Sequence, residues 1–424
     1  MNKSFSQIYI PIDTTKNDIH KSFVADFTSK HKKAINLIKD EFSGDFRREI
    51  SKLHEAQFEE ILKDFNKGEV YFEEDNQKYL NDLLGIILKF NPELNNQGIK
   101  VHFSRETNPN AFSIGDGNII VNLNLLKITQ NEGELVSVLC HEIAHYILRH
   151  REKSYKKNVE NITSKEFKKE VRDIASSKYN KQKRAQNLFK EVLYTRKSKS
   201  RIHEIEADSL GITYFNKTNF NPKYAIDLLS NLANSDVEKD GLVEQDLRFF
   251  FTTKNQNFIE EWLVKEDFSG YKYNKEHLLK WNIDSLKTHP DCEERIKEIE
   301  VSNNIISTKN FQLNSNAFNN LKKIAHYETV ANLYYFKKYG YSLYEALKLL
   351  KIKKDDSYLL KMVSENLIML EKSKKEFKLN KYIPKINPNE QSDSEQLFIN
   401  FMNNLTLKEL ETLSTDYINS SNKK

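Results

Sequence analysis

The sequence predicts an α+β fold that is mainly helical, with a small sheet beside a buried central helix and an α-helical C-terminal region. Gly and Pro together number 18 of 424 residues, about 4% against a usual combined share of about 12%, which favours long helices. Hydrophobic residues recur with a helical period over most of the chain, except for short apolar runs around one Gly-rich turn. Helices are therefore expected before and after a short β segment.

Three helices are expected before this β segment. Residues 16–66 show two amphipathic helical periods that break near Ser43-Gly44, and residues 75–90 show a third that stops before Asn91-Pro92. A strand is expected at residues 98–103.

A β-hairpin is expected next. Residues 111–114 and 118–122 are short apolar runs that flank Gly115-Asp116-Gly117, a composition typical of a tight turn. An edge strand of this kind can pair with an extended peptide through the main chain.

An HExxH pattern at residues 141–145 lies within an apolar stretch that predicts a buried helix. Four residues separate His141 from His145, so both imidazoles share one face of the helix, while the Glu142 carboxylate is placed beside a metal-bound water. Asn131, followed three residues later by Glu134, predicts a capping box at the start of this helix. The pattern indicates a zinc site with its own general base.

A second acidic motif follows 59 residues after His145, at the predicted start of another apolar helix. Catalytic zinc takes three protein ligands and a water, and Glu204 is the expected third ligand to one ion per chain. Asp208, on the same face, is expected to accept the free N–H of a ligating histidine. Glu206 falls on another face and is expected to be solvated. His203 is expected to be a neighbour of the site, with zinc ligation as the alternative.

Other catalytic classes do not fit the spacing. A metzincin needs Gly at position 148 and His at position 151, where this chain has Leu148 and Arg151. His150 comes one residue too early for that pattern. No Gly-rich phosphate loop and no local nucleophile motif is present in the sequence.

A third motif, HPxxxxRI, begins at His289. With the two others it resembles the HtpX-like and CAAX-prenyl-protease-like zinc endopeptidases of peptidase family M48, over about residues 70–300. The resemblance implies a gluzincin-type metallopeptidase domain, whose ExxxD motif is followed by a glycine that Gly211 matches. It also implies a substrate-binding strand beside the cleft, at Asn110-Ala111-Phe112.

His289 has two expected catalytic roles. A donor is needed where negative charge develops on the scissile carbonyl, and His289 is the best candidate, with Arg295 as a structural anchor or second donor. Alternatively, the imidazole fills the fourth position on zinc in the resting enzyme, so that its loop acts as a gate. A capping or packing role remains the third interpretation.

These motifs predict a zinc metalloendopeptidase that hydrolyses peptide bonds, with unfolded or misassembled proteins as substrates and protein quality control as the setting. The alternative is a zinc-binding, chaperone-like or adaptor protein whose protease activity is latent or absent. In that case the helical C-terminal region would carry the function by binding a protein partner.

The expected organisation has four parts. An N-terminal helical region (1–70) precedes the zinc metallopeptidase domain (71–304), which contains a basic helical insertion (151–200). A helical region that faintly resembles a tetratricopeptide hairpin (305–380) is followed by a linker, one terminal helix and a polar tail (381–424).

Charge and hydropathy limit the partners. Residues 149–201 carry 18 Lys or Arg and six Asp or Glu, a local balance of +12 in a chain whose total is +5. Such a run is typical of a solvated helical arm, with peripheral contact to anionic lipid or acidic protein as the alternative. No nucleic-acid module accompanies it, so nucleic acid is not expected as a partner.

A membrane span is not expected, because no apolar run approaches about 18 residues. The basic Met1-Asn2-Lys3 start is not followed by an apolar segment, so a cytoplasmic location is expected from the sequence as written. A periplasmic location is the alternative, if an N-terminal signal was trimmed.

Overall fold

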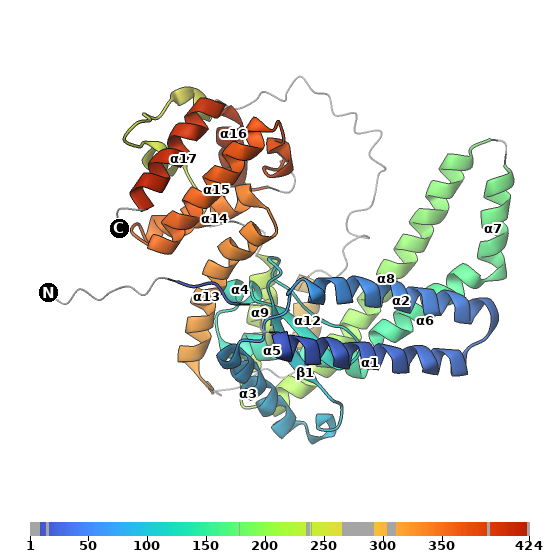
Figure 1. Ribbon diagram of the computed structural model, residues 1–424. Coiled ribbons are helices and arrows are strands. Elements are labelled where there is room, and N and C mark those ends of the chain that lie inside the picture. The colour runs from blue at the N-terminus through green and yellow to red at the C-terminus, as the bar shows by residue number, and fades with distance from the viewer. Residues whose placement is uncertain are drawn as a thin grey trace.

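The computed structural model describes residues 9–13, 17–177, 179–234, 238, 240–264, 292–302, 311–387 and 391–421. It is mainly helical with a small three-stranded sheet, which confirms the predicted fold class. Figure 1 shows a central part that contains the sheet, two long helical pairs that project from it, and a group of helices that includes the C-terminus.

The sheet has the strand order β1-β3-β2, where β1 is Lys100–Ser104, β2 is Ala111–Ser113 and β3 is Asn118–Asn122. β1 runs parallel to β3, and β2 runs antiparallel to it, so the predicted hairpin is confirmed and β2 lies at a sheet edge. Gly115 and Gly117 in the turn have φ angles of 83° and 94°, a conformation that favours glycine.

Several of the described helices enclose the main hydrophobic core together with the sheet. α3 (Glu74–Phe90) packs on β1, and α5 (Glu132–Ile147) packs on β2 and β3. The C-terminal half of α8 (Lys181–Lys217) lies along α5, and α9 (Lys223–Ala233) and α12 (Cys292–Ser302) pack against this pair. Two short elements complete this part: α4 (Leu125–Ile128) and a 3-10 turn, η1 (Pro92–Leu94).

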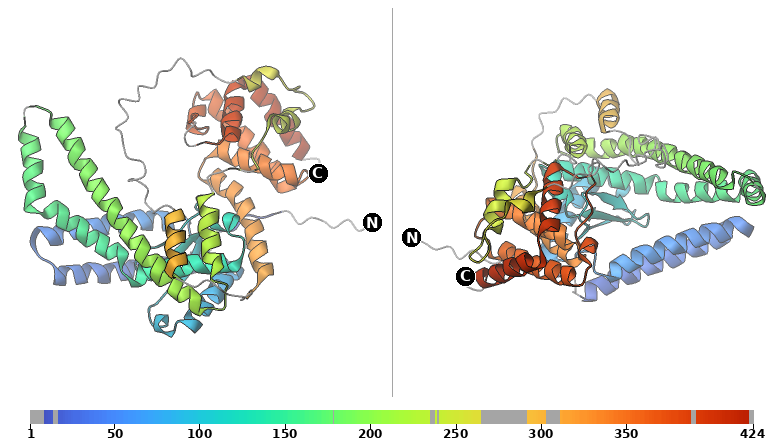
Figure 2. Two further views of the ribbon diagram at one scale, coloured as in Figure 1. Left: turned by 180° about the vertical axis from the view of Figure 1, so that it is seen from behind. Right: turned by 90° about the horizontal axis from the view of Figure 1, so that it is seen from above.

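The two projecting helical pairs extend toward the same side of the central part (Figures 1 and 2). The first consists of α1 (Asn17–Glu41) and α2 (Gly44–Asn66), with the break where the sequence predicts it. The second is formed by α6 (His150–Thr163) and α7 (Lys165–Ser176), which return through the N-terminal half of α8. α2 packs against α6. The contact reaches the far end of the first pair, where Ile38 and Ile50 pack against Val159 and Asp45 pairs with Lys168.

α8 differs from our expectation. We predicted that the second acidic motif begins a new helix, but it lies inside one 37-residue helix that starts at the far end of the basic arm. The arm and the ligand-bearing segment are therefore parts of one continuous helix.

A second hydrophobic core lies in the C-terminal part. Its helices are α13 (Ser315–Tyr335), α14 (Tyr339–Ile352), α15 (Ser357–Lys375), α16 (Asp393–Asn404) and α17 (Leu407–Ser421), with the 3-10 turn η4 (Leu379–Lys381). In the described part of residues 381–424, two helices rather than the single expected one therefore follow the linker. α13 contributes residues to both cores, for example Leu321 to the first and Val330 to the second, and so joins the two parts.

α10 (Glu244–Phe251) and the 3-10 turn η2 (Glu260–Leu263) also pack in the second core, through residues such as Phe251 and Trp262. They do so because their apolar faces contact the C-terminal helices, although both elements precede the boundary that we expected at residue 304. That boundary therefore does not separate the two cores.

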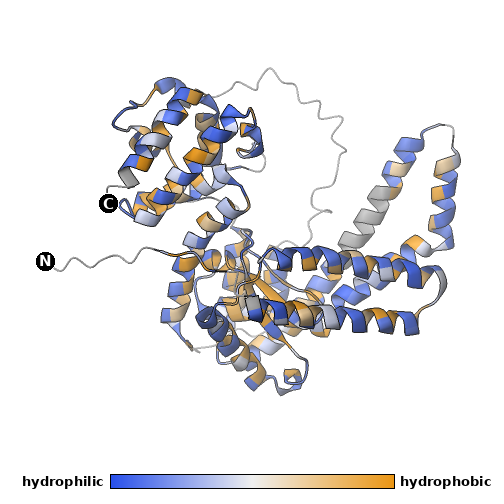
Figure 3. Ribbon diagram, viewed as in Figure 1, coloured by the Kyte–Doolittle hydropathy of each residue, from blue (hydrophilic) through white to orange (hydrophobic). Residues whose placement is uncertain are grey.

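Figure 3 shows many hydrophobic residues in the central part, whereas the projecting helical pairs are mainly hydrophilic. Among the described residues, no helix is both long and apolar enough to cross a bilayer.

Candidate metal centre

α5 positions the HExxH residues on a rigid, buried helix. Its N-cap Asn131 accepts a hydrogen bond from the backbone N–H of Glu134 at 3.0 Å, as in the predicted capping box. The return bond differs from the prediction, because the Glu134 carboxylate accepts from the backbone N–H of Gln130 at 2.9 Å and from the Asn131 side-chain amide instead. Side chains of both Asn131 and Glu134 therefore satisfy backbone N–H groups at the start of the helix.

The two histidines of α5 converge as their spacing predicts. The Nε2 atoms of His141 and His145 lie 3.0 Å apart. Glu204 of α8 faces them, with carboxylate oxygens 3.5 Å from the His141 Nε2 and 3.4 Å from the His145 Nε2. These are the three side chains that we predicted as metal ligands, and their donor atoms lie close enough together to hold one ion.

Close packing of α8 on α5 allows this convergence. A Cβ atom added to Gly211 would lie 2.9 Å from the Cα of His141 and 3.2 Å from the carbonyl oxygen of Cys140. Any larger residue at this position would push the two helices apart.

The three donors fit a zinc ion. With bonds of about 2.0–2.1 Å and tetrahedral angles, two zinc ligands lie about 3.3 Å from each other. The three separations of 3.0, 3.4 and 3.5 Å bracket that value. Two neutral imidazoles and one carboxylate are a donor set that zinc prefers, and they leave a fourth position for water or substrate.

Asp208 contacts the His141 ring, as the sequence predicts, and Arg295 in turn binds Asp208. An Asp208 oxygen lies 2.9 Å from the His141 Nδ1, and the Arg295 guanidinium on α12 donates two hydrogen bonds to Asp208, at 2.6 and 2.7 Å. Burial disfavours a charged imidazole, but the Asp208 and Glu204 carboxylates outweigh it and raise the pKa of His141 to about 10. A cation is therefore strongly favoured at this point.

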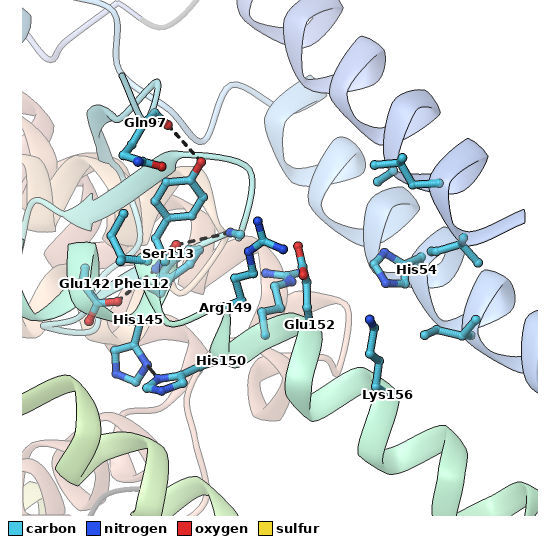
Figure 4. Close-up of a pocket in the computed structure, with 18 of the residues that line it drawn as sticks. His54, Gln97, Phe112, Ser113, Glu142, His145, Arg149, His150, Glu152 and Lys156 are labelled. Carbon is cyan, nitrogen blue, oxygen red and sulfur yellow. Dashed lines mark hydrogen bonds between the residues drawn. The ribbon is translucent and has the colours of Figure 1, made fainter. Parts of the chain in front are cut away.

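Glu142 lies on the cleft side of the same helix, and its carboxylate accepts a hydrogen bond from the backbone N–H of Ser113 at 3.0 Å (Figure 4). Burial raises the pKa of Glu142 above its ordinary value, although the His141 and His145 rings oppose this shift. A carboxylate with a raised pKa is better suited to accept and return a proton near neutral pH.

The centre opens into a cavity of about 1010 Å³ between β2, α5, the start of α6 and the α1–α2 pair. Figure 4 shows Glu142 and His145 on one side of this cleft and His54 of α2 across from them. The predicted substrate-binding residues Asn110, Ala111 and Phe112 line it as well.

A smaller, mainly apolar pocket of about 250 Å³ lies on the other side of the HExxH residues. The pocket is bordered by Asn110, Ala111, His141 and Glu142. Its walls include large apolar side chains from α8, α9 and α12, namely Ile212, Phe215, Leu228, Leu229, Leu232 and Ile299.

A second polar cluster adjoins the centre and was not predicted. The Nδ1 atoms of His150 and His145 lie 2.8 Å apart, and the His150 Nε2 lies 2.9 Å from a Glu206 oxygen. Our expectation that Glu206 is solvated is therefore incomplete: its side chain is 46% exposed, yet it binds His150. The His203 ring stacks on the His150 ring, with 4.3 Å between the ring centroids. His203 is therefore a neighbour of the site, as expected.

His289 lies outside the described residues, so both of its expected roles stay predictions. Arg295, from the same motif, is described and anchors Asp208.

The comparisons with known proteins agree with this geometry. The model of peptidase family M48 matches residues 80–302, which is more than half of the chain. The mitochondrial metalloendopeptidase OMA1 of Saccharomyces cerevisiae is 26% identical over 163 residues, which are 37% of this chain and 44% of that protein. The match thus spans less than half the length of this curated relative.

Proposed function

The chain belongs to peptidase family M48, and we propose that it is a zinc-dependent metalloendopeptidase of the gluzincin type. One observation carries this proposal. The Glu142 carboxylate lies on the cleft side of a helix whose two histidines, together with Glu204, form a three-donor set. A metal site that only stabilised the fold would have four protein ligands and would need no base beside an open cleft.

Each residue has a defined part in the reaction. His141, His145 and Glu204 would hold the ion. Bound zinc would polarise the scissile carbonyl and lower the pKa of its water toward about 7. Glu142 accepts the proton of the attacking water and returns it to the leaving nitrogen.

The edge strand β2 supports binding of an extended peptide. The backbone N–H of Ile114 donates to the Asn118 carbonyl, and the N–H of Asn122 donates to the Asn110 carbonyl. Since backbone groups alternate along a strand, those of Ala111 point away from β3, toward the open edge. A substrate could pair with them in an extended conformation, which favours unfolded or flexible protein segments.

The apolar pocket adds a preference for side chains. It begins at His141 and Glu142, next to the expected position of the scissile bond, and is lined mainly by apolar residues. We propose that a large apolar side chain adjacent to the scissile bond fits this pocket, as exposed segments of misfolded proteins would supply.

Metal analysis combined with cleavage of unfolded casein tests the function. The purified protein should contain about one zinc per chain, should cut casein at internal bonds, and should lose activity with a chelator and regain it with zinc. Bound zinc without cleavage of any unfolded substrate would contradict the peptidase proposal and favour the zinc-binding, chaperone-like alternative.

A further inference from the structure

The second polar cluster consists of His150, His203 and Glu206, at the point where the basic arm joins the metal centre. His150 is the first residue of α6 and is only 4% exposed. Its ring is held on three sides: by His145 through Nδ1, by Glu206 through Nε2, and by the stacked ring of His203. Nearly buried polar groups with short contacts of this kind have a defined hydrogen-bond arrangement.

The proton positions in this cluster follow from the metal site. His145 directs its Nε2 toward His141 and Glu204, so the proton of its neutral ring is on Nδ1 when Nε2 binds a metal. That N–H faces the His150 Nδ1 at 2.8 Å, and the His150 Nδ1 must therefore accept. The His150 proton is then on Nε2, which donates to Glu206 at 2.9 Å.

We propose, on the basis of the proposed zinc peptidase function, that His150 and Glu206 are positioning residues for the zinc ligand His145. His150 accepts the Nδ1–H of His145 and so fixes both its tautomer and its ring orientation. Glu206 in turn fixes the tautomer of His150. The two zinc histidines are thus supported differently, His141 directly by the Asp208 carboxylate and His145 by a carboxylate acting through a second histidine.

The same cluster could instead hold a second metal ion, because its three donors lie close enough together. The proton positions oppose this occupant. A metal on the His150 Nε2 would put the His150 proton on Nδ1, where it would face the Nδ1–H of His145 at 2.8 Å. Occupation of the main site by zinc therefore favours the hydrogen-bonded arrangement over a second ion.

The backbone explains how His150 reaches this position. On one continuous helix, a residue five positions after His145 would point about 140° away from it. Arg149, between α5 and α6, instead has a φ of 55°, so the chain changes direction and His150 turns back toward His145.

Zinc affinity, measured by competition with a chromophoric chelator, tests the proposal without relying on activity. His150→Ala should weaken zinc binding about 10- to 100-fold, the range for groups that orient a metal ligand. His150→Asn, whose side-chain oxygen can accept from the His145 Nδ1–H, should restore most of the affinity. Glu206→Ala should weaken binding less, and should have no further effect in the His150→Ala background, because Glu206 acts through His150.

Several results would overturn the proposal. These are wild-type zinc affinity in His150→Ala, equal affinities of His150→Ala and His150→Asn, or additive effects of the two alanine variants. Two zinc ions per wild-type chain, falling to one in His203→Ala, would show that the cluster is a second metal site. Wild-type protein that binds no zinc would instead refute the proposed function itself. If the wild type binds zinc and cleaves substrate but the variants behave otherwise than predicted, only the role of His150 and Glu206 is refuted.

Discussion

The backbone N–H of Ser113 on the edge strand donates to the Glu142 carboxylate on α5 at 3.0 Å. This bond connects the strand that would bind substrate with the residue that would move the proton. The N–H of Ser113 points away from β3, as do the backbone groups of Ala111, so it takes no part in the sheet ladder.

Replacement of Ser113 by proline therefore removes this donor without removing a ladder hydrogen bond. A hydrogen bond to a charged group contributes about 1.5–3 kcal/mol, so Ser113→Pro should lower kcat/KM about 10- to 100-fold while zinc content stays the same. Ser113→Ala is the matched control, because it keeps the N–H and should cleave at nearly the wild-type rate. Equal activities of the two variants would show that the bond does not position Glu142.

The acidic motif of α8 should divide into a ligand and a supporting residue. Glu204→Ala should lose zinc or bind it far more weakly, because a carboxylate 3.4–3.5 Å from both Nε2 atoms disappears. Asp208→Ala should weaken zinc binding by a smaller factor, about 10- to 100-fold, since Asp208 acts through His141. Chelator competition on both variants checks this ranking, and the reverse order would show that the assignment of the third ligand is wrong.

The contact between α5 and α8 predicts an effect on stability. Gly211→Ala should destabilise the protein by about 1–3 kcal/mol and weaken zinc binding, because its Cβ would meet the backbone of His141. Gly85→Ala is a matched control inside helix α3, where an added Cβ meets nothing within 4 Å. It should stabilise by about 0.5–1 kcal/mol. Urea unfolding curves of the two variants should therefore shift in opposite directions.

Stability should fall in mild acid partly because of His102. Burial lowers the pKa of His102 to about 4, whereas an unfolded histidine titrates near its ordinary value of 6.5. The unfolded chain therefore binds more protons between these values, so the stabilisation is complete above pH 6.5 and is lost as the pH falls toward 4. His102→Gln should reduce this pH-dependent loss by up to about 3 kcal/mol.

Urea midpoints at pH 7.5, 5.5 and 4.5 measure this loss. Some slope should remain in the variant, because burial also lowers the pKa values of His54 and His326 to about 4. A slope that the substitution leaves unchanged would contradict the role of His102.

The parts of the site that the sequence could predict are those set by helix periodicity. His141 and His145 are four residues apart on α5, and Glu204 and Asp208 are four apart on α8, so each pair shares a helix face wherever the helices lie. The residue types then indicate zinc, and the structure brings the expected ligands within 3.0–3.5 Å of one another.

The contact between His150 and Glu206 could not be predicted in this way. It depends on Arg149, whose left-handed backbone conformation turns the chain between α5 and α6. No glycine in the sequence marks that turn. It also depends on α8 continuing unbroken from the arm into the centre, whereas we expected a helix to start near Glu204. Long-range packing decides both features, and local sequence patterns do not contain that information.

The central claim, that Glu142 is the general base of a zinc peptidase, is tested most directly by Glu142→Gln. The substitution keeps the size of the side chain and an oxygen that can accept from the Ser113 N–H, but it removes the group that takes the proton. Zinc content and casein cleavage should be measured on the same preparations of both proteins. We predict about one zinc per chain in each, with kcat lower in the variant by about 10²- to 10⁴-fold or more. Cleavage by the zinc-loaded variant at the wild-type rate would contradict the account.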